Sequence, residues 1–249
     1  MSEDPFVTHR GLLFTVAYEL LGSAADAEDV LQESWLRWKD VDQAEVREPR
    51  AYLVRIVTRQ ALNHLRTVSR RREEYVGEWL PEPLLTSPDV ADDVELAESV
   101  SMAMLTVLET LAPTERAVFV LREVFDVPYD EIAKAVDKTP AAVRQIAHRA
   151  KDHVAARRPR VTVDRTEQEA VVARFIAAVS SGDVQGLMDV LAPDVVSVAD
   201  GGGVVRVEVA GELVGAVSMD IEDGRIARLY SVANPDKLGW LDEEAVITR

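Results

Sequence analysis

The sequence predicts a multi-domain protein in which two all-α domains, the second with a helix-turn-helix, precede a smaller α+β domain. Apolar residues recur at three- and four-residue spacing over most of the first 160 residues, which is typical of amphipathic helices. Acids and prolines interrupt this pattern near residue 80, and valine-rich segments separated by glycines replace it after residue 190. The 249 residues provide room for two or three small domains.

The first domain, expected over residues 1–75, contains three predicted helices. They cover residues 6–21, 24–39 and 49–72. Gly22 ends the first helix, because glycine readily adopts the left-handed conformation found at helix C-termini. Ser23 begins a capping box for the second helix, and Pro49 starts the third because its fixed φ suits the first turn.

Two of these helices carry distinctive outer faces. The second presents the acidic and amide side chains of Glu28, Asp29, Gln32 and Glu33. The third presents a mainly cationic face formed by Arg55, Arg59, Asn63, Arg66, Arg70 and Arg71. An acidic face is usually only solvated, and arginines at a helix end also complement the helix dipole. Six arginines on one helix exceed that need, which favours neutralisation of nucleic-acid phosphates.

An acidic segment, expected to be a linker over residues 76–100, follows the first domain. It contains an apolar and proline-rich stretch formed by Trp79, Leu80, Pro81, Glu82 and Pro83. Exposing a tryptophan and a leucine in a flexible linker is unfavourable. We therefore expect this stretch to pack on the surface of a domain.

The second helical domain is expected over residues 101–160. Helices are predicted over residues 94–111, 113–124 and 128–136, and a last helix starts at Pro140. The first of these begins within the linker. Thr139 can cap this last helix, so the final pair reads as a helix-turn-helix. The outward face of the last helix consists of Arg144, Gln145, His148, Arg149 and Lys151.

A helix with such a face fits the DNA major groove. Arginine and glutamine can bind guanine and adenine edges there, while neighbouring cations bind phosphates. The alternative is an ordinary helical bundle whose polar face is only solvated, because exposed cations need no special explanation.

Formal charge is distributed unevenly along the chain. The net charge of −16 at pH 7 by itself argues against a nucleic-acid partner. Residues 53–75, however, contain six arginines and two glutamates, and residues 137–160 contain seven lysines or arginines and two aspartates. Residues 73–98 contain nine acids and no base. We therefore expect basic binding surfaces that alternate with acidic ones.

The composition also excludes several kinds of site. The chain has no cysteine, which excludes disulfides, thiolate metal sites and cysteine nucleophiles. Its four histidines are scattered, so we expect neither a metal site nor a cofactor. Neither a run of about 18 apolar residues nor a signal-peptide pattern occurs, so we expect a cytoplasmic location without membrane association.

The third domain, expected over residues 161–249, begins with helices and continues with strands. Helices are predicted over residues 166–180 and then up to Leu191. A meander of four strands is predicted over residues 194–199, 204–210, 212–221 and 225–233. Possible catalytic carboxylates at Asp183, Asp194 and Asp200 lie at turn or cap positions. We therefore expect no catalytic residue.

The two helical domains resemble bacterial RNA polymerase sigma factors of the extracytoplasmic-function type. The matching blocks are Asp26–Glu33 with Tyr52–Arg59, and Leu108–Arg116 through Ala147–Ala150. The resemblance implies that the acidic face of the second helix binds the clamp helices of the polymerase's largest subunit. It implies that the cationic face of the third helix contacts the separated minus-ten element. It also implies that the helix-turn-helix, Thr139 included, reads the minus-thirty-five duplex.

The third domain resembles the cone-shaped fold of SnoaL-like polyketide cyclases and nuclear-transport-factor-like proteins. Its 86 residues after position 163 are short for this fold, so we expect a shortened domain that lacks a piece after Gly203. Three stretches resemble signature motifs of the sigma-factor subgroup with a SnoaL-like extension: Trp79–Pro83, Asp200–Gly203 and Asn234–Leu238. The resemblance implies interdomain roles for the first stretch and for Asp200, Gly201, Asn234, Pro235, Asp236, Lys237 and Leu238.

Two functions remain compatible with these features. The favoured one is a non-enzymatic sigma factor that binds core RNA polymerase and promoter DNA, is regulated by its own third domain and requires no separate anti-sigma factor. The alternative is a DNA-binding regulator whose third domain is a cyclase- or isomerase-like enzyme or a sensor of a small-molecule ligand, since a cone-shaped pocket can hold an apolar molecule. Regulation within the chain predicts that Trp79 and Leu80 contact the segment Asn234–Leu238.

Overall fold

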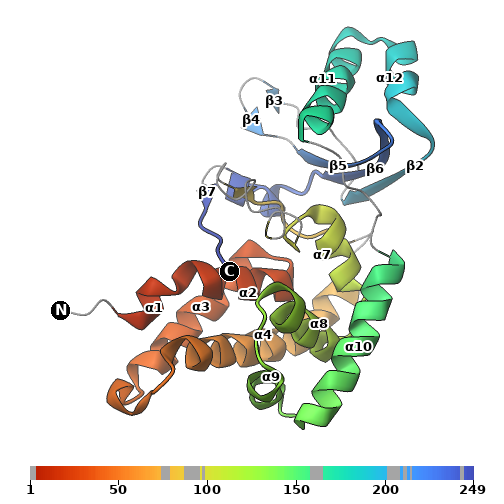
Figure 1. Cartoon of the computed structure of the whole chain (residues 1–249). Helices are drawn as coiled ribbons and strands as arrows, with labels where there is room; N and C mark the ends of the chain where they lie inside the picture. Colours follow the sequence, from red (N-terminus) through yellow and green to blue (C-terminus); the bar gives the residue numbers. More distant parts are fainter. Residues whose placement is uncertain are drawn as a thin grey trace. The chain divides into compact units, whose positions relative to one another are not determined.

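The computed structural model describes most of the chain (Figure 1). The described residues are 4–73, 79–86, 96, 99–157, 165–200, 208–209, 212–213, 215–241 and 244–249. The chain divides into a helical unit of residues 1–75, 84–158 and 240–249, and a C-terminal unit of residues 76–83 and 159–239. Within the described residues, no helix is both long and apolar enough to cross a membrane.

The helical unit begins with four α-helices and a short 3-10 helix. They are α1 (Pro5–Thr8), α2 (Arg10–Leu21), α3 (Ala24–Lys39), the 3-10 helix η1 (Gln43–Glu45) and α4 (Pro49–Glu73). The expected ends at Gly22 and Ser23 are confirmed. Gly22 has a φ of 66°, and the Ser23 hydroxyl accepts a hydrogen bond of 3.1 Å from the Asp26 amide. The prediction of one helix over residues 6–21 is wrong, because the chain leaves helical geometry at His9.

The unit continues with a second set of helices. They are α7 (Met102–Glu109), α8 (Pro113–Phe119), η2 (Val120–Val124), α9 (Tyr129–Val136) and α10 (Pro140–Arg157). The expected α-helix over residues 113–124 is only partly right, because η2 is a π-helix. In this wider turn the Phe125 amide donates to the Val120 carbonyl at 3.3 Å. The helix-turn-helix is formed by α9 and α10, as predicted.

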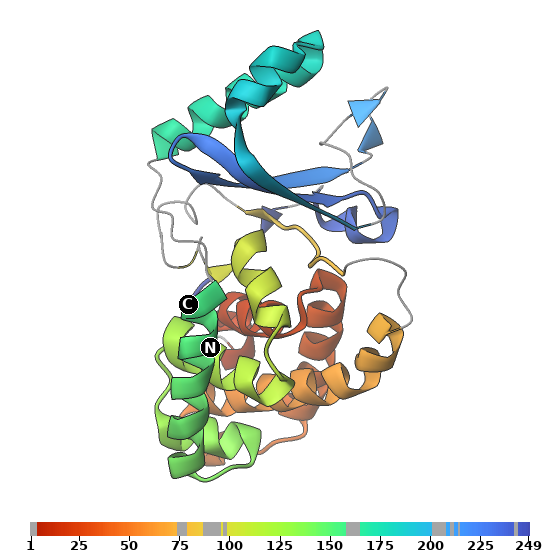
Figure 2. The ribbon, with the colours of Figure 1, turned by 90° about the vertical axis from the view of Figure 1, so that its right-hand side faces the viewer.

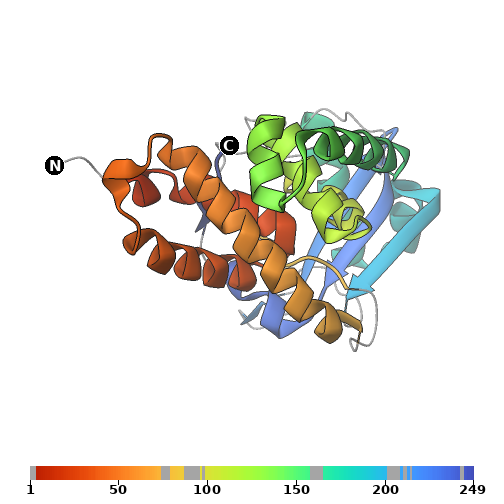
Figure 3. The same ribbon diagram turned by 90° about the horizontal axis from the view of Figure 1, so that it is seen from below.

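One hydrophobic core joins both sets of helices. Helix α2 lies at its centre, since every residue from Leu12 to Leu21 is buried. Helices α2, α3 and α4 pack against one another, and α2 also contacts α7 and α8 (Figure 3). The largest fully buried side chain is that of Trp38, whose indole Nε1 donates to Asp4 Oδ1 at 2.9 Å. The two predicted helical domains therefore share a single core.

The C-terminal unit places two helices on one face of a small sheet (Figure 2). Its main elements are α11 (Arg165–Ser181), α12 (Val184–Val190), β2 (Leu191–Asp200), β5 (Ala216–Glu222) and β6 (Arg225–Val232). The strand order is β2-β6-β5. Val171 and Phe175 from α11 pack with Val190, Ile221 and Ile226. Helices followed by a sheet are therefore present, as predicted.

The strand pairing differs from the predicted meander. Strand β2 pairs with β6 in parallel, whereas β5 pairs with β6 in antiparallel. The β5–β6 turn uses Asp223 and Gly224, whose φ values of 50° and 71° suit the twist of a tight hairpin. The single strand expected over residues 212–221 is divided into β4 (Glu212–Leu213) and β5. Of the strand expected over residues 204–210, only β3 (Glu208–Val209) lies within the described residues.

The last residues of the chain return to the helical unit. Strand β7 (Glu244–Ala245) pairs in parallel with β1 (Leu85–Thr86). Ile247 joins the core of the unit, and the Thr248 amide donates to Thr15 Oγ1 at 3.0 Å. A Cβ at Gly11 would lie 3.1 Å from the Thr248 hydroxyl and 3.3 Å from the Val246 carbonyl oxygen, so glycine allows this segment to approach α2 closely. This docking was not predicted from the sequence.

The shared core leads to a stability prediction. Ile132 on α9 is completely buried, whereas Ile176 on α11 is 51% exposed. Ile132→Ala is expected to lower the free energy of unfolding of the helical unit by about 2–5 kcal/mol, because it removes buried methylenes and leaves a cavity. Ile176→Ala, the matched control, is expected to change stability by less than about 0.5 kcal/mol. Urea unfolding followed by circular dichroism tests both, and equal losses would contradict the burial of Ile132.

Candidate functional site

The helix-turn-helix is held by local hydrogen bonds and by a buried inner face. Asp137 ends α9 in the left-handed conformation with a φ of 55°. The Thr139 hydroxyl accepts from the Ala142 amide at 3.2 Å, which is the cap expected for α10. The inner face of α10 is buried through Val143, Ile146, Ala147, Ala150 and Val154. The opposite face is therefore fixed toward solvent.

The exposed face of α10 carries the predicted DNA-reading residues. Arg144, Gln145, His148, Arg149 and Lys151 are all exposed. The Arg144 guanidinium lies 5.6 Å from the centre of the Tyr129 ring, which restricts its orientation. His148 Nδ1 lies 2.9 Å from Asp152 Oδ2. The sequence thus identified the exposed face correctly, but it did not reveal these partners.

Lys151 is already paired with an acid on another helix, η2. Its Nζ donates to Glu123 Oε2 at 2.6 Å. This hydrogen bond, together with the charge of Glu123, raises the pKa of the Lys151 ammonium. The group therefore stays charged, but a phosphate has to compete with Glu123 for it.

One arginine of the predicted cationic face of α4, Arg59, is already bound to another helix of the helical unit. The Arg59 guanidinium donates from Nη2 to the Lys134 carbonyl at 2.7 Å and from Nε to the Ala135 carbonyl at 3.4 Å. These carbonyls belong to the last turn of α9, where a cation also complements the helix dipole. Arg66 Nη1 donates to Asn63 Oδ1 at 3.2 Å. The side chains of Arg70 and Arg71 lie outside the described residues.

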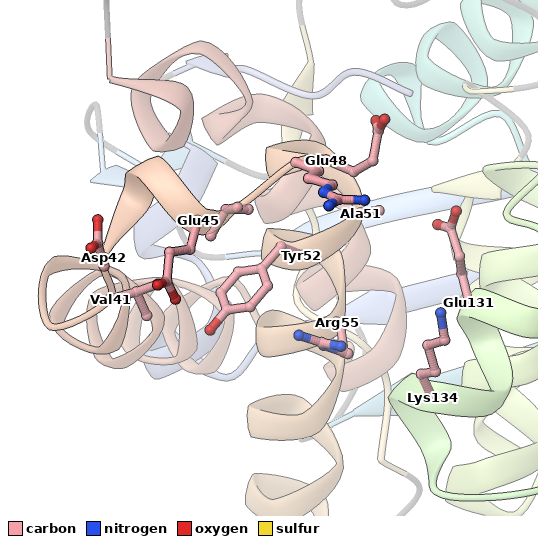
Figure 4. A pocket seen from close by; sticks show the side chains of 11 residues that line it. Val41, Asp42, Glu45, Glu48, Ala51, Tyr52, Arg55, Glu131 and Lys134 are labelled. Carbon is pink, nitrogen blue, oxygen red and sulfur yellow. The ribbon is translucent and has the colours of Figure 1, made fainter.

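A cleft lies between the start of α4 and the first helix of the helix-turn-helix (Figure 4). It has a volume of about 490 Å³. Arg55 lies on the α4 side with its guanidinium 4.8 Å from the centre of the Tyr52 ring, while Glu131 and Lys134 of α9 line the other side. The cleft therefore joins Arg55, one of the residues expected to contact the minus-ten element, with residues of the other predicted DNA-reading domain.

The acidic face of α3 is partly occupied by bonds within the protein. Glu28 binds Arg10 with two hydrogen bonds of 2.8 and 2.7 Å, and Glu33 Oε2 accepts from Gln60 Nε2 at 2.7 Å. Asp29 and Gln32 are exposed. Hence Asp29 and Gln32 are the members of this face that a partner reaches without first breaking a bond to the protein.

The predicted contact between the two motif segments is confirmed within the C-terminal unit. Lys237 is only 2% exposed, and its Nζ donates to the Leu80 carbonyl at 2.7 Å. The same Nζ lies 3.4 Å from the centre of the Trp79 ring. Leu80, Pro81, Glu82 and Leu238 are also buried. A buried ammonium requires such partners, because desolvation of an isolated charge is costly.

The other predicted motif residues have different positions. Asn234 Oδ1 accepts from the Asp236 amide at 3.0 Å and so shapes the 3-10 helix η3 (Pro235–Lys237). Pro235 and Asp236 are exposed, and Pro83 is half-buried. Asp200 ends β2, but its side chain and Gly201 lie outside the described residues.

A polar pair that the sequence analysis did not find lies on the sheet. The Tyr230 hydroxyl on β6 donates to Asp220 Oδ2 on β5 at 2.9 Å, and Arg228 Nη1 lies 3.8 Å from the same oxygen. Burial raises the pKa of both Asp220 and Tyr230. Tyr230 is paired with Ser218 in the strand register, so the sequence gives no direct signal that Asp220 is its partner.

Comparison with known proteins agrees with this arrangement. Residues 6–71 match the family model for Sigma-70 region 2, and residues 101–154 match that for Sigma-70, region 4. The chain is 41% identical to the ECF RNA polymerase sigma factor SigJ of Mycobacterium tuberculosis over 207 residues, which are 82% of this chain and 66% of SigJ. It is 30% identical to the probable ECF RNA polymerase sigma factor SigI of the same species, over 95% of this chain and 94% of SigI.

A solved structure extends the likeness to the C-terminal unit. The crystal structure of Mycobacterium tuberculosis SigJ matches with a TM-score of 0.72 and 32% identity, over 93% of this chain and 96% of that chain. The similarity to known sigma factors therefore extends over the two regions that match the Sigma-70 models and over the helices and sheet of the C-terminal unit. The chain belongs to the extracytoplasmic-function RNA polymerase sigma factors.

Proposed function

We propose that this chain directs promoter-specific transcription initiation by core RNA polymerase in the cytoplasm and that its C-terminal unit regulates it. The observation that carries the promoter-reading role is the exposed face of α10. Arg144 and Gln145 are exposed there, and within the described part of the chain their hydrogen-bonding groups have no protein partner. Both can therefore bind base edges of the minus-thirty-five duplex without first losing a bond to the protein.

Docking on polymerase is assigned to the acidic face of α3. Asp29 and Gln32 are exposed, so they are suited to the clamp helices of the largest subunit. Glu28 and Glu33 adjoin them, and their bonds to Arg10 and Gln60 orient this face. A face with this charge favours a basic partner surface, and long-range attraction also accelerates its encounter with that surface.

The minus-ten element is assigned to α4. Arg55 and Arg66 lie on the expected face, and Arg59 joins them once it leaves the carbonyls of α9. When that contact breaks, the Arg59 guanidinium exchanges its two hydrogen bonds to backbone carbonyls for hydrogen bonds to DNA phosphate. Promoter binding and separation of α4 from α9 are therefore linked in this proposal.

Regulation by the C-terminal unit rests on Lys237. The linker stretch at Trp79 and Leu80 leads into the second set of helices, and Lys237 holds it through a hydrogen bond and a ring contact. A linker held in this way has less freedom to place the two DNA-reading regions on one promoter. The same chain thereby provides the control that a separate anti-sigma factor would otherwise supply. This control needs no catalytic step.

The first prediction concerns base reading. Arg144→Ala is expected to weaken binding of the minus-thirty-five duplex by about 1–3 kcal/mol and to relax the preference at one base pair. Lys151→Ala is the control, because loss of a phosphate contact lowers the affinity for all sequences alike. Fluorescence anisotropy with single-base variants of the duplex measures both effects. A loss for Arg144→Ala that is equal on every sequence would contradict its role in base reading.

The second prediction concerns polymerase docking. Asp29→Lys is expected to reduce the affinity for core polymerase by at least tenfold, because it places a cation against a basic partner. Asp40→Lys makes the same charge change at the C-terminal end of α3, outside the acidic face, and is expected to have little effect. Surface plasmon resonance at physiological salt compares the two variants. If both bind equally well, the acidic face is only solvated.

The third prediction concerns the Lys237 contact. Lys237→Met and Trp79→Ala are each expected to change the rate of transcription initiation, and the double variant should differ from additivity by about 0.5–3 kcal/mol because the two residues touch. Asp236→Ala is the control, since its side chain is exposed. Single-round transcription in vitro measures the effect. Strict additivity would show that the Trp79–Lys237 contact does not carry the regulation.

A further inference from the structure

A buried carboxyl group links α2 to the segment that precedes α7. Glu19 lies on α2 and is only 1% exposed. Its Oε1 lies 2.8 Å from the Ser99 hydroxyl, while its Oε2 is buried and has no hydrogen-bond partner within the described part of the chain. Burial raises the pKa of Glu19 to about 8, and the Ser99 hydrogen bond opposes this shift only in part.

The hydrogen bonds at Ser99 can be completed by a protonated Glu19. The Ser99 hydroxyl lies 2.8 Å from Glu19 Oε1 and 2.9 Å from the Leu96 carbonyl, but it has only one hydrogen to donate. If Ser99 donates to Leu96, a protonated Glu19 can donate to Ser99, and both contacts are satisfied. An ionised Glu19 would instead accept the Ser99 hydrogen, and the Leu96 carbonyl would keep its hydrogen bond from the Val100 amide. The observations that favour a neutral acid in the packed state are the burial of the carboxyl group and the absence of a partner for Oε2 within the described part of the chain, because a carboxylate would lose its hydration there.

No described charge offsets this burial. Helix α2 packs against α1, α3, α4, α7, α8 and η2, and the buried charged residue among these neighbours is Arg116 of α8. Arg116 donates to the Leu20 carbonyl at 2.8 Å and to both carboxylate oxygens of Glu109 at 2.9 and 3.0 Å. Its charge is thus already paired with Glu109. The pKa of Glu19 depends on its burial and on Ser99 alone.

We propose that Glu19 is a proton-dependent latch between α2 and Ser99, which lies shortly before α7. The acid is neutral while the two elements are packed together. It ionises when they separate, so separation releases one proton to solvent. This inference goes beyond the proposed function, because it concerns how the two sets of helices are held together and not what they bind.

The direction of the pH dependence follows from proton linkage. An exposed glutamate ionises near pH 4.3, whereas packed Glu19 retains its proton up to about pH 8. Between these values the packed state binds one more proton than the separated state. The ratio of separated to packed molecules therefore rises by about tenfold per pH unit in this window. Below and above the window, Glu19 contributes no pH dependence.

The test uses the full chain, which has no cysteine of its own. Cysteines introduced at the exposed positions Val7 and Ala112 accept a pair of fluorophores that report on separation of the two sets of helices. The urea concentration at which energy transfer is half lost is measured between pH 5 and pH 9. Glu19→Gln keeps a hydrogen-bond donor to Ser99 but cannot ionise. Glu115→Gln on the neighbouring helix α8 is the matched control.

The wild type and Glu115→Gln are expected to lose resistance to urea as the pH rises to about 8, relative to Glu19→Gln. The difference between wild type and Glu19→Gln isolates Glu19 from all other titrating groups. Between about pH 5 and pH 8, this difference should correspond to a change of about tenfold per pH unit in the ratio of separated to packed molecules. A carboxyl carbon resonance of Glu19 in the wild type should titrate near pH 8. Parallel profiles for wild type and Glu19→Gln, or titration of Glu19 near pH 4.3, would overturn the proposal.

Discussion

The burial of α2 from Leu12 to Leu21 is the constraint on which the helical unit depends. A helix buried over this length can pack neighbours on every side, but its polar side chains must find partners inside the protein. Thr15 and Glu19 are such side chains, and both are buried. Thr15 Oγ1 donates to the Gly11 carbonyl and accepts from the Thr248 amide, while Glu19 binds Ser99. Segments far away in the sequence are therefore required to complete the environment of one N-terminal helix.

This packing affects the surfaces assigned to promoter DNA. The same core that holds α2 also places α9 beside α4, where Arg59 binds the carbonyls of Lys134 and Ala135. Lys151 is likewise bound to Glu123. Under the proposed function, DNA gains full contact with these cations only after such bonds are exchanged for phosphate contacts. The packed state therefore lowers the net free energy gained on promoter binding, while Arg144 and Gln145 remain available.

The sequence predicted best those features that depend on neighbouring residues. Gly22, Ser23 and Thr139 mark helix ends because their conformations or side chains act within one turn. The exposed face of α10 follows from a helical period that places Val143 and Ile146 inside. The roles of these surfaces came from the resemblance to sigma factors, because an exposed arginine looks the same in a solvated helix and in a DNA-binding one.

Features that depend on distant residues were missed for a physical reason. The parallel pairing of β2 with β6 and the docking of β7 on β1 join segments that no local period connects. The contact between the linker stretch and Asn234–Leu238 was predicted from the motif resemblance, but the side chain that makes it could not be chosen in advance. Asp236 and Lys237 are adjacent, and only the 3-10 turn at η3 determines which of them faces Trp79.

Burial of Lys237 makes this contact cooperative. Removing a charged ammonium from water costs several kcal/mol unless a carbonyl or a ring replaces the lost solvent. The Leu80 carbonyl and the Trp79 ring both do so. If the linker stretch departs, Lys237 loses both contacts together, because the carbonyl and the ring belong to adjacent residues. Under the proposed function, this coupling favours a linker stretch that is held or released as a whole.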